Sequence, residues 1–384
     1  MLKKKTFLKV ESLLLAFIML ISLNTFATTL DVSDSSEKVS VSESIDSLAE
    51  KYLRVDTKTD ERGSVTEYVR NVKDFKEKIY EEHDELSDIE IAKLIYQYMG
   101  EDASVIENLP EDKLLEALTI EQCSRTHNFI KFNENGSQEY LSKEQVSREL
   151  SKLPENHMIT EEGKNLLYEV SGSKEMTRDS NVTISNDGYM KLTTTAYATT
   201  GNQAGRSYYF VEAQATWLKI PAFKVQDVLA ITSDATYDNQ YNNFGYYTQN
   251  TYIVCHSPDI HGGTNGFYQN LNNRINKNTG ANNPDCIWLE YSSGIAGIVL
   301  RFDMYEFSYS GSTGHTVTYS NMNAFLRYKV SLYNTDGNVQ AAYGHMKVGI
   351  GSISVSLLTG SISFSAVGAK DEYHGETLPI YDYK

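Results

Sequence analysis

Cysteine is scarce in this sequence, with three residues in 384, and long apolar runs are absent beyond the first 27 positions. A scaffold stapled by many disulfides is therefore excluded, and a chain of this length can bury enough apolar surface to fold without them. A membrane-spanning helix needs roughly 20 apolar residues. We therefore expect no transmembrane segment once the N-terminal signal described below has been removed.

Basic residues are outnumbered, with 35 Lys and Arg against 51 Asp and Glu and a formal net charge of −16. An acidic chain repels phosphate backbones, so we expect no nucleic acid partner. The imbalance lies in the first half: residues 28–180 hold 35 acidic and 19 basic residues, whereas residues 181–384 hold 15 and 12. The two halves therefore differ in surface electrostatics.

Residues 1–27 have the order of a secretory signal peptide. Lys3, Lys4 and Lys5 are followed by an apolar run from Leu13 to Leu23 and a small residue at Ala27. A basic, then apolar, then small-residue order is typical of cleavable signals. We predict a secreted protein, extracellular or associated with the cell wall. The alternative is an uncleaved N-terminal anchor, but a lipid anchor is excluded because no cysteine follows the apolar run.

Helical patterns dominate residues 41–170, after a lead-in at 28–40 that we expect to be flexible. Pairs typical of helix N-terminal capping boxes occur three times: Ser64 with Glu67, Ser87 with Glu90, and Ser142 with Gln145. Gly100 is placed to stop one helix, and residues 110–118 carry a further leucine stripe. A single short strand is expected at residues 129–132. This region is predicted to be an acidic helical module.

Strand patterns replace helical ones near residue 180, and 20 of the 27 tyrosines lie beyond it. Residues 209–217 and 326–332 alternate between apolar and polar side chains, as half-buried strands do. An Asp-Gly pair at Asp336 and Gly337 predicts a turn. Repeated strands without intervening helices indicate an antiparallel β-sandwich or barrel-like domain at 181–384, which makes the chain α+β.

Chemically reactive residues are densest at Cys255, His256, Asp259 and His261. With a distant base such as His345 they could form a nucleophilic site, so a secreted hydrolase is one hypothesis. The histidine spacing matches no zinc pattern, and we expect neither a metal nor another cofactor. The other interpretation is a strand end followed by a loop. Cys255 and Cys286 are also candidates for a disulfide, with two free thiols as the alternative.

Residues 234–284 are rich in Asn, Tyr and Gly and are predicted to be a long irregular stretch. Aromatic rings stack on sugars and amides bind hydroxyl groups, so such a stretch suits contact with a glycan, the cell wall or a protein surface. The candidate binding residues are Tyr237, Tyr241, Tyr246, Tyr247 and Tyr268. A non-enzymatic binding or interaction module is therefore the leading hypothesis.

A third hypothesis, a pore-forming or membrane-active protein, rests on residues 352–366, where serine alternates with Ile, Val, Leu and Phe. Hairpins that insert into membranes alternate in this way, and so do ordinary sandwich strands. The arms are shorter than the 9–11 residues that a strand needs to cross a bilayer, which favours the ordinary strand.

Several segments resemble parts of uncharacterised exported proteins of Gram-positive bacteria. They are residues 92–100, 109–118, 215–221, 227–228 and 342–345. The resemblance implies export. It implies no activity and assigns no functional residue.

Overall fold

The computed structural model describes residues 35–133, 137–153, 159–172, 188–201, 205–220, 226–238, 241, 243–256, 264–276, 287–291, 297–303, 315–346, 353–358, 361–366 and 370–382. The chain divides into two compact units, Met1–Leu48 and Ala49–Lys384. Helix α2 (Ser35–Tyr52) begins within residues 28–40, the predicted lead-in, whose flexibility stays a prediction. The predicted signal peptide lies outside the described residues.

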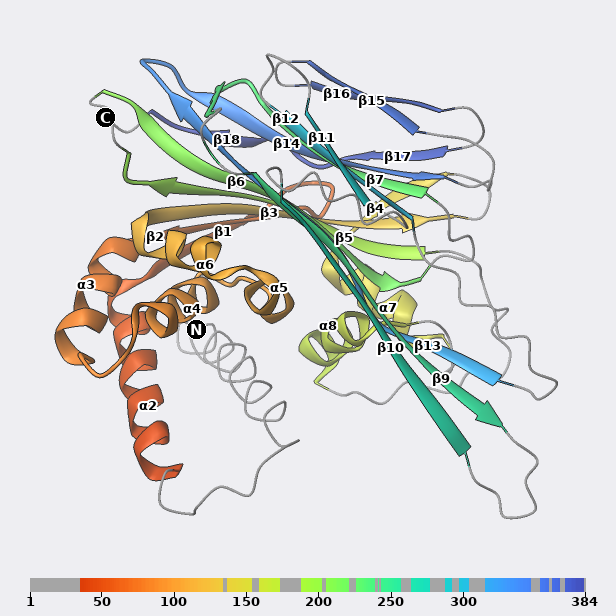
Figure 1. Ribbon diagram of the computed structural model, residues 1–384, viewed down its shortest axis with the longest axis horizontal. Coiled ribbons are helices and arrows are strands. Elements are labelled where there is room, and N and C mark those ends of the chain that lie inside the picture. The colour runs from red at the N-terminus through yellow and green to blue at the C-terminus, as the bar shows by residue number, and fades with distance from the viewer. Residues whose placement is uncertain are drawn as a thin grey trace. The chain divides into compact units, whose positions relative to one another are not determined.

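Short helices follow in the second unit (Figure 1). They are α3 (Val72–Glu82), α4 (Asp88–Tyr98), α5 (Ala103–Asn108), α6 (Glu111–Leu115), the 3-10 helix η1 (Glu116–Thr119), α7 (Lys143–Ser151) and α8 (Glu161–Ser171). The capping boxes predicted at Ser87 and Ser142 are confirmed at the starts of α4 and α7. Gly100 follows α4 with a left-handed φ of 83°, which glycine adopts without a steric penalty.

The capping box predicted at Ser64 and Glu67 is wrong. These residues belong to a hairpin of β1 (Arg54–Thr59) and β2 (Val65–Arg70). The Ser64 hydroxyl accepts a hydrogen bond from the Asn128 amide at 2.6 Å instead of capping a helix. Residues 65–70 are rich in β-branched and aromatic side chains, and strand pairing prevails over the local capping signal there.

A large antiparallel sheet connects both halves of the sequence. Its other strands are β3 (Ile120–Phe132), β4 (Gln138–Leu141), β5 (Gly188–Thr199), β6 (Ser207–Lys219), β8 (Thr236–Tyr237), β9 (Phe244–His256), β10 (Thr264–Asn276) and β13 (His315–Leu332). Within the described ranges their order is β1-β2-β3-β5-β6-β13-β9-β10, with β4 on β3 and β8 on β13. Because β3 pairs with β5, the change of pattern near residue 180 is not a boundary between compact units.

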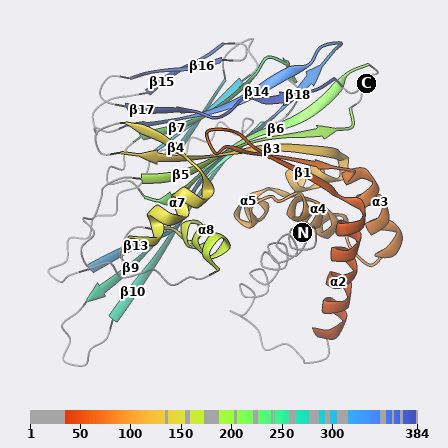
Figure 2. The ribbon, with the colours of Figure 1, turned by 180° about the vertical axis from the view of Figure 1, so that it is seen from behind.

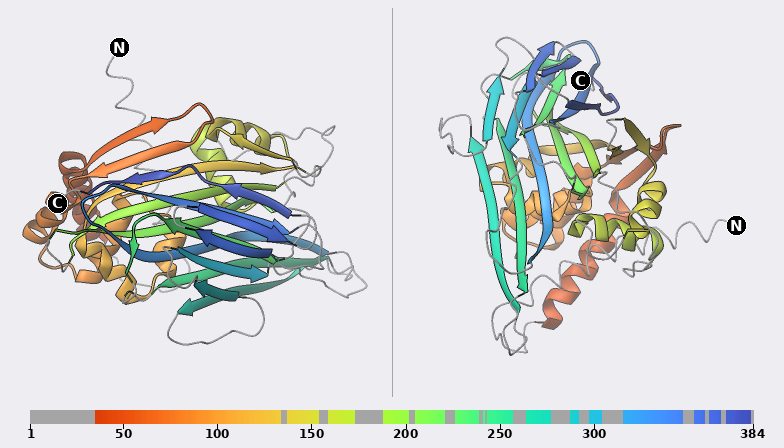
Figure 3. Two further views of the ribbon diagram at one scale, coloured as in Figure 1. Left: turned by 90° about the horizontal axis from the view of Figure 1, so that it is seen from above. Right: turned by 90° about the vertical axis from the view of Figure 1, so that its right-hand side faces the viewer.

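A second antiparallel sheet packs on one face of the first (Figure 3). It consists of β7 (Gln226–Ser233), β11 (Ile287–Tyr291), β12 (Gly297–Asp303), β14 (Gly337–Met346), β17 (Lys370–His374) and β18 (Leu378–Ile380). The turn predicted at Asp336 and Gly337 links β13 to β14, which lie in different sheets. Over the described strands neither sheet closes on itself, so the fold is α+β with a sandwich-like β-region.

The hairpin predicted at residues 352–366 is present as β15 (Ile353–Leu358) paired with β16 (Ser361–Ala366). Across the described residues it pairs with neither large sheet and packs against β7. Ile362 and Phe364 are buried, whereas Ser361, Ser363 and Ser365 are exposed. Apolar side chains therefore fasten this hairpin to the sandwich.

The main hydrophobic core fills the space between the two large sheets. Trp217 is 1% exposed in this core, and its indole N–H donates to the Tyr343 hydroxyl at 3.2 Å. The alternation predicted for residues 209–217 and 326–332 is confirmed, because the apolar members of both runs lie in this core. A second cluster, which includes Phe129 and Leu218, lies beneath α7 and α8.

Helices α3–α8 cover the opposite face of the first sheet (Figures 1 and 2). Two buried arginines on that face bind helix ends. Arg125 donates to the carbonyls of Met99 and Gly100 at 2.9 and 2.6 Å, at the end of α4. Arg327 donates to the Lys113 carbonyl in α6 at 3.0 Å. A cation satisfies the free carbonyls and the negative dipole at a helix C-terminus. The helix-facing side of the sheet is therefore polar although it is buried.

Candidate functional site

The structure places the predicted binding tyrosines in strands and in the core. The prediction that residues 234–284 are irregular is wrong for the described part, where β9 and β10 pair along their full length. Tyr246 and Tyr247 are 0% and 2% exposed and stack on Phe325 and Phe302, with ring centroids 5.1 and 4.5 Å apart. Side chains buried in this way offer no surface to a ligand.

The remaining candidate tyrosines have different positions. Tyr237 is half-buried against the main core, and the Asn243 amide donates to its hydroxyl at 2.6 Å. The Tyr241 hydroxyl donates to Glu116 at 2.8 Å, and its ring lies 3.8 Å from the Lys113 ammonium. Tyr268 pairs with Tyr252 in β10, and its side chain lies outside the described residues.

The cysteine and histidine cluster is only partly described. Cys255 and His256 end strand β9, where Cys255 pairs with Asn265 of β10 and His315 of β13. Asp259, His261 and Cys286 lie outside the described residues, so the hydrolase and the disulfide remain predictions. Along the described ranges no three His, Cys, Asp or Glu side chains converge as a metal site would require.

His345, the proposed distant base, lies in β14 inside the sandwich. Its Nδ1 is 2.7 Å from Asp227 Oδ1, and Tyr343 donates to the same carboxylate. His345 is 3% exposed and its ring lies 5.8 Å from those of Phe132 and Trp217. His345 and Asp227 therefore belong to the core, because aromatic rings surround the imidazole and the carboxylate is fully buried.

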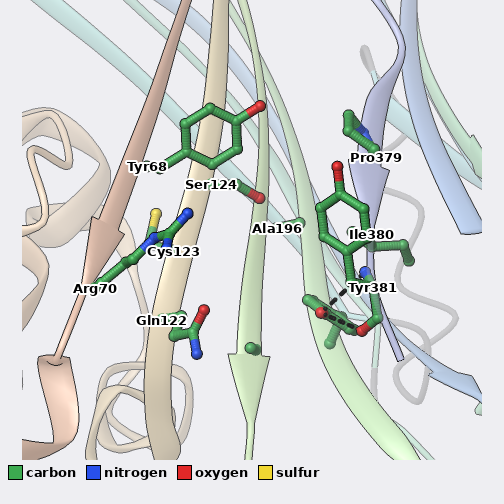
Figure 4. A pocket seen from close by; sticks show the side chains of 11 residues that line it. Tyr68, Arg70, Gln122, Cys123, Ser124, Ala196, Pro379, Ile380 and Tyr381 are labelled. Carbon is green, nitrogen blue, oxygen red and sulfur yellow. Dashed lines mark hydrogen bonds between the residues drawn. The ribbon is translucent and has the colours of Figure 1, made fainter. Parts of the chain in front are cut away.

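A groove of about 280 Å³ lies where the first sheet extends beyond β18, and we call it the tyrosine groove. Its lining residues are Tyr68, Arg70, Gln122, Cys123, Ser124, Ala196, Ala198, Tyr209, Pro379, Ile380 and Tyr381. Figure 4 shows Tyr68 and Tyr381 on opposite sides of β3 and β5, with Ser124 and Ala196 between them. Small side chains thus form a floor between two aromatic walls.

Tyr209 holds the backbone of one wall of the tyrosine groove in place. The Tyr209 hydroxyl donates to the Tyr381 carbonyl at 2.7 Å and accepts from its N–H at 3.2 Å. Burial and the neighbouring Tyr381 raise the pKa of Tyr68, so its hydroxyl stays protonated at neutral pH. Arg70 is the charged residue of the lining, and it is exposed. The groove therefore offers fixed aromatic faces, hydroxyl and amide groups, and one cation.

A second cavity, also of about 280 Å³, lies on the helix-facing side of the same sheet, and we call it the charged cleft. Its lining residues are Val65, Glu67, Gly100, Asp102, His127, Phe129, Lys143, Glu162, Asn165, Leu166, Glu169, Lys191 and Leu218. Lys191 of β5 lies 3.0 Å from Asp102 and 3.3 Å from Glu162. One ammonium group is thus shared by two carboxylates.

Protonation states in the charged cleft follow from these contacts. Burial lowers the pKa of His127, which is therefore neutral at pH 7. Its Nε2 lies 3.7 Å from Glu67 and its Nδ1 lies 3.0 Å from the Thr193 hydroxyl. With the proton on Nε2, His127 holds the pKa of Glu67 down to about 2. The paired carboxylates differ, because the pKa of Asp102 is lowered and burial raises that of Glu162.

Neither cavity was predicted from the sequence. The tyrosine groove takes side chains from β2, β3, β5, β6 and β18, and the charged cleft takes them from four strands, from helices α7 and α8 and from the segment between α4 and α5. No two of Tyr68, Ser124 and Tyr381 are neighbours in the sequence. The strand alternation of residues 120–132 could have placed Ser124 and His127 on opposite faces, but β3 was expected to be much shorter.

Comparison with known proteins identifies no relative. No family model matches the chain, and no curated protein matches it. Among solved structures, Clostridium perfringens delta-toxin is 10% identical, with 48% of this chain and 83% of that chain covered, at a TM-score of 0.23. The membrane-inserted form of the Clostridium perfringens NetB toxin is 9% identical over 48% and 89%, at a TM-score of 0.19. Scores this low show no shared fold and indicate no function.

Proposed function

We propose that this chain is an exported, non-enzymatic binding protein and that its tyrosine groove binds carbohydrate. The observation that carries the proposal is the pair of tyrosine walls flanking a floor of small residues (Figure 4). Export is supported by the basic, apolar and small-residue order of residues 1–27. Among the described helices, none is both long and apolar enough to cross a bilayer.

The two walls suit a flat ligand with apolar faces. A pyranose ring presents C–H groups on its faces and hydroxyl groups at its rim. Tyr381 is 54% exposed and Tyr68 is half-buried, and both side chains line the groove. Their hydroxyl groups also stay available as hydrogen-bond donors, as at other amphipathic aromatic sites. Sugar rings thus match both the shape and the chemistry of the walls.

The polar side chains of the groove suit the rim of a sugar. Ser124 lies on β3 between the walls, and Gln122 lines the groove further along the same strand, so both can donate to and accept from hydroxyl groups. Arg70 adds a planar cation at one end, which favours a sugar that carries a carboxylate. A short, weakly acidic oligosaccharide is therefore the ligand class that the groove fits best.

The direct test is calorimetric titration of the full chain with oligosaccharides. Cellotetraose and trigalacturonate serve as neutral and acidic probes. We expect the acidic probe to bind more tightly, and we expect Tyr68→Ala and Tyr381→Ala each to weaken binding about tenfold, a loss of ~1.4 kcal/mol. The Tyr381 backbone bonds to Tyr209 do not involve the side chain that is removed.

Tyr333→Ala is the matched control. Tyr333 is 57% exposed and is not among the residues lining the tyrosine groove. Its loss should leave binding unchanged. Equal affinities for the wild type and both wall variants, or no binding of either probe, would refute the proposal.

A further inference from the structure

Strand β1 forms one end of the first sheet. Among the strands that the structure describes it pairs with β2 alone, so the backbone N–H and C=O groups of its second edge face away from the sheet. Val55 is 43% exposed, and Thr57, Lys58 and Thr59 are exposed as well. Because successive side chains of a strand point to opposite faces, both faces of β1 are open to solvent. An edge of this kind can accept another strand.

The charges along β1 alternate in sign on one face. Arg54, Asp56 and Lys58 share this face, and Asp60 follows directly after the strand. Within one copy Arg54 lies 3.3 Å from Asp56, whereas Lys58 forms no ion pair with any residue that the structure describes. Asp60 accepts two backbone N–H groups of its own turn through a single carboxylate oxygen, which leaves its other oxygen for a partner. The order of charges is therefore positive, negative, positive, negative.

This order is complementary to itself when the strand is turned end for end. If two copies of β1 pair antiparallel about Thr57, Arg54 lies opposite Asp60 of the second copy. Asp56 then lies opposite Lys58 of the second copy, and symmetry repeats both contacts. Side chains directly opposite each other in an antiparallel pair lie close enough for opposite charges to attract. Every charged residue of the edge thus meets a residue of the other sign.

Neighbouring registers bring like charges together. A two-fold axis between antiparallel strands joins residues that lie on the same face, so the axis passes through a residue. With the axis at Asp56, that carboxylate faces its own copy and Arg54 faces Lys58. With the axis at Lys58, two lysines meet. Like charges directly opposite each other are destabilising, so both registers are disfavoured relative to the one about Thr57.

Length also favours the register about Thr57. It pairs residues 55–59, so that Val55 lies beside Thr59 of the second copy and the two copies of Thr57 meet at the centre. Such β-branched side chains pack well across a pleated sheet. An axis at Val55 would also join opposite charges, but it would pair only residues 54–56 of the strand. The charges and the length of the edge therefore select the same register.

We propose that two copies of this chain associate through β1 into a two-fold symmetric dimer, in which their first sheets form one continuous antiparallel sheet. The partner is a second copy because the charges of the edge are complementary to themselves. Both copies contribute the same surface, as in other isologous dimers. The edge is short beside a standard interface of about 1,600 Å², so the dimer should be weak, with a dissociation constant of about 10–100 µM.

The dimer has a consequence for carbohydrate binding, which rests on the function proposed above. Tyr68 pairs with Asp56 across the hairpin, so the tyrosine groove and the charge contacts lie on the same face of the sheet. A two-fold axis perpendicular to the sheet keeps both grooves on that face. The two copies of Tyr68 are then separated, across the strands, by three inter-strand spacings or about 15 Å. One polysaccharide surface could therefore engage both grooves at once.

Sedimentation velocity of the full chain, without carbohydrate, tests the association directly. We expect the sedimentation coefficient to rise towards that of a dimer between about 1 and 300 µM protein. The rise should be smaller in high salt, which screens exposed charge pairs. Deuterium exchange of the amides in residues 54–60 should slow as the dimer forms. A chain that stays monomeric throughout this range would overturn the proposal.

Two charge reversals test the register. Asp56→Lys places lysines opposite lysines, and Lys58→Asp places carboxylates opposite carboxylates, so each should raise the dissociation constant at least about tenfold. An equal mixture of the two variants should recover the dimer, because the lysines of one copy then face the aspartates of the other. Loss in each variant alone followed by recovery on mixing is a pattern that misfolding cannot produce.

Glu149→Lys and Lys152→Asp are the matched controls. The two residues form a surface ion pair at the end of α7, and their reversal changes the net charge by the same amounts. Both variants should dimerise as the wild type does. Dimerisation that persists in Asp56→Lys or Lys58→Asp, or that mixing does not recover, would contradict the assigned register.

The dimer and the carbohydrate site can fail separately. Tyr381→Ala should weaken oligosaccharide binding in the tyrosine groove and leave sedimentation unchanged. Asp56→Lys should abolish the rise in sedimentation whether or not any oligosaccharide binds. A rise that is lost in Tyr381→Ala and kept in Asp56→Lys would place the contact between copies at the groove and overturn the assignment to β1.

Discussion

Tyr68 of β2 and Tyr381, which follows β18, lie on either side of Ser124 and Ala196 (Figure 4). The pair arises because β18 belongs to the second sheet while β2 lies near the edge of the first, so the groove forms where one sheet ends over the other. Pairing of β2 with β3 fixes the backbone at Tyr68, and the Tyr209 hydroxyl fixes the backbone at Tyr381. Fixed backbone positions keep the two rings on either side of the floor.

Removing the charge of Arg70 should change which sugars bind. With Arg70→Gln we expect the affinity for trigalacturonate to fall about tenfold, because a charge-assisted bond to a carboxylate contributes ~1.5–3 kcal/mol. Cellotetraose should bind as it does to the wild type. Parallel titration of the two probes is the measurement, and an equal loss for both would show that Arg70 supports the groove only structurally.

Filling the floor of the groove should block it. Ser124 is half-buried between the tyrosine walls, so the ring in Ser124→Phe would occupy the space that a sugar needs. We expect oligosaccharide binding to be lost while the thermal unfolding midpoint stays within a few degrees of the wild type. Ser124→Ala, which leaves the space open, is the matched control. Binding that survives Ser124→Phe would place the ligand elsewhere.

Removing Arg125 should destabilise the protein strongly. Its guanidinium group is 2% exposed and lies 2.7 Å from Glu101, which is 3% exposed. Arg125→Met would leave that carboxylate buried without its cation, with the Tyr197 hydroxyl as a remaining donor, and we expect the free energy of unfolding in urea to fall by ~3–5 kcal/mol. Lys164→Met, which breaks the exposed pair with Glu161, should cost less than ~1 kcal/mol. Similar losses in both variants would contradict this view of the helix–sheet interface.

The low pKa of Glu67 predicts an acid-dependent loss of stability. The folded-state pKa is about 2 against an ordinary value of 4.5. Stability from the ionised Glu67 is therefore complete above pH 4.5 and is lost as the pH falls towards 2, because the unfolded chain binds the proton first. Unfolding in urea at several pH values should show a shallower loss in Glu67→Gln. Glu61→Gln, in the turn of the same hairpin, should keep the wild-type slope, and equal slopes in all three proteins would contradict the prediction.

Features that depend on residues close in sequence, such as helix caps, were predicted correctly. The capping boxes at Ser87 and Ser142 form as predicted, because each is satisfied by atoms within four residues. The alternation of residues 209–217 also places its apolar side chains in the core as expected. The same pattern could not show that Glu212 and Gln214 would be buried as well, beneath the helices rather than in water.

Strands with polar side chains were the main source of error. Residues 244–256 were predicted to be irregular because Tyr, Asn and Gln interrupt the alternation of apolar side chains. In the structure they form β9, which pairs with β13 and β10 and buries both Tyr246 and Tyr247. A strand that is covered on one face by a sheet and on the other by helices has no face exposed to solvent. Its apolar and polar side chains therefore alternate only weakly, and pairing with distant strands decides its structure.

The α+β class, the caps of individual helices and the apolar face of several strands follow from local sequence, since these depend on neighbours within a few residues. Packing of the distant elements was needed to show that helices α3–α8 and the strands share one unit, that Tyr68 and Tyr381 flank one groove, and that Lys191 joins Asp102 to Glu162. Each of those relationships joins residues on separate elements. Strand order and register, which follow from packing the whole chain, bring them together.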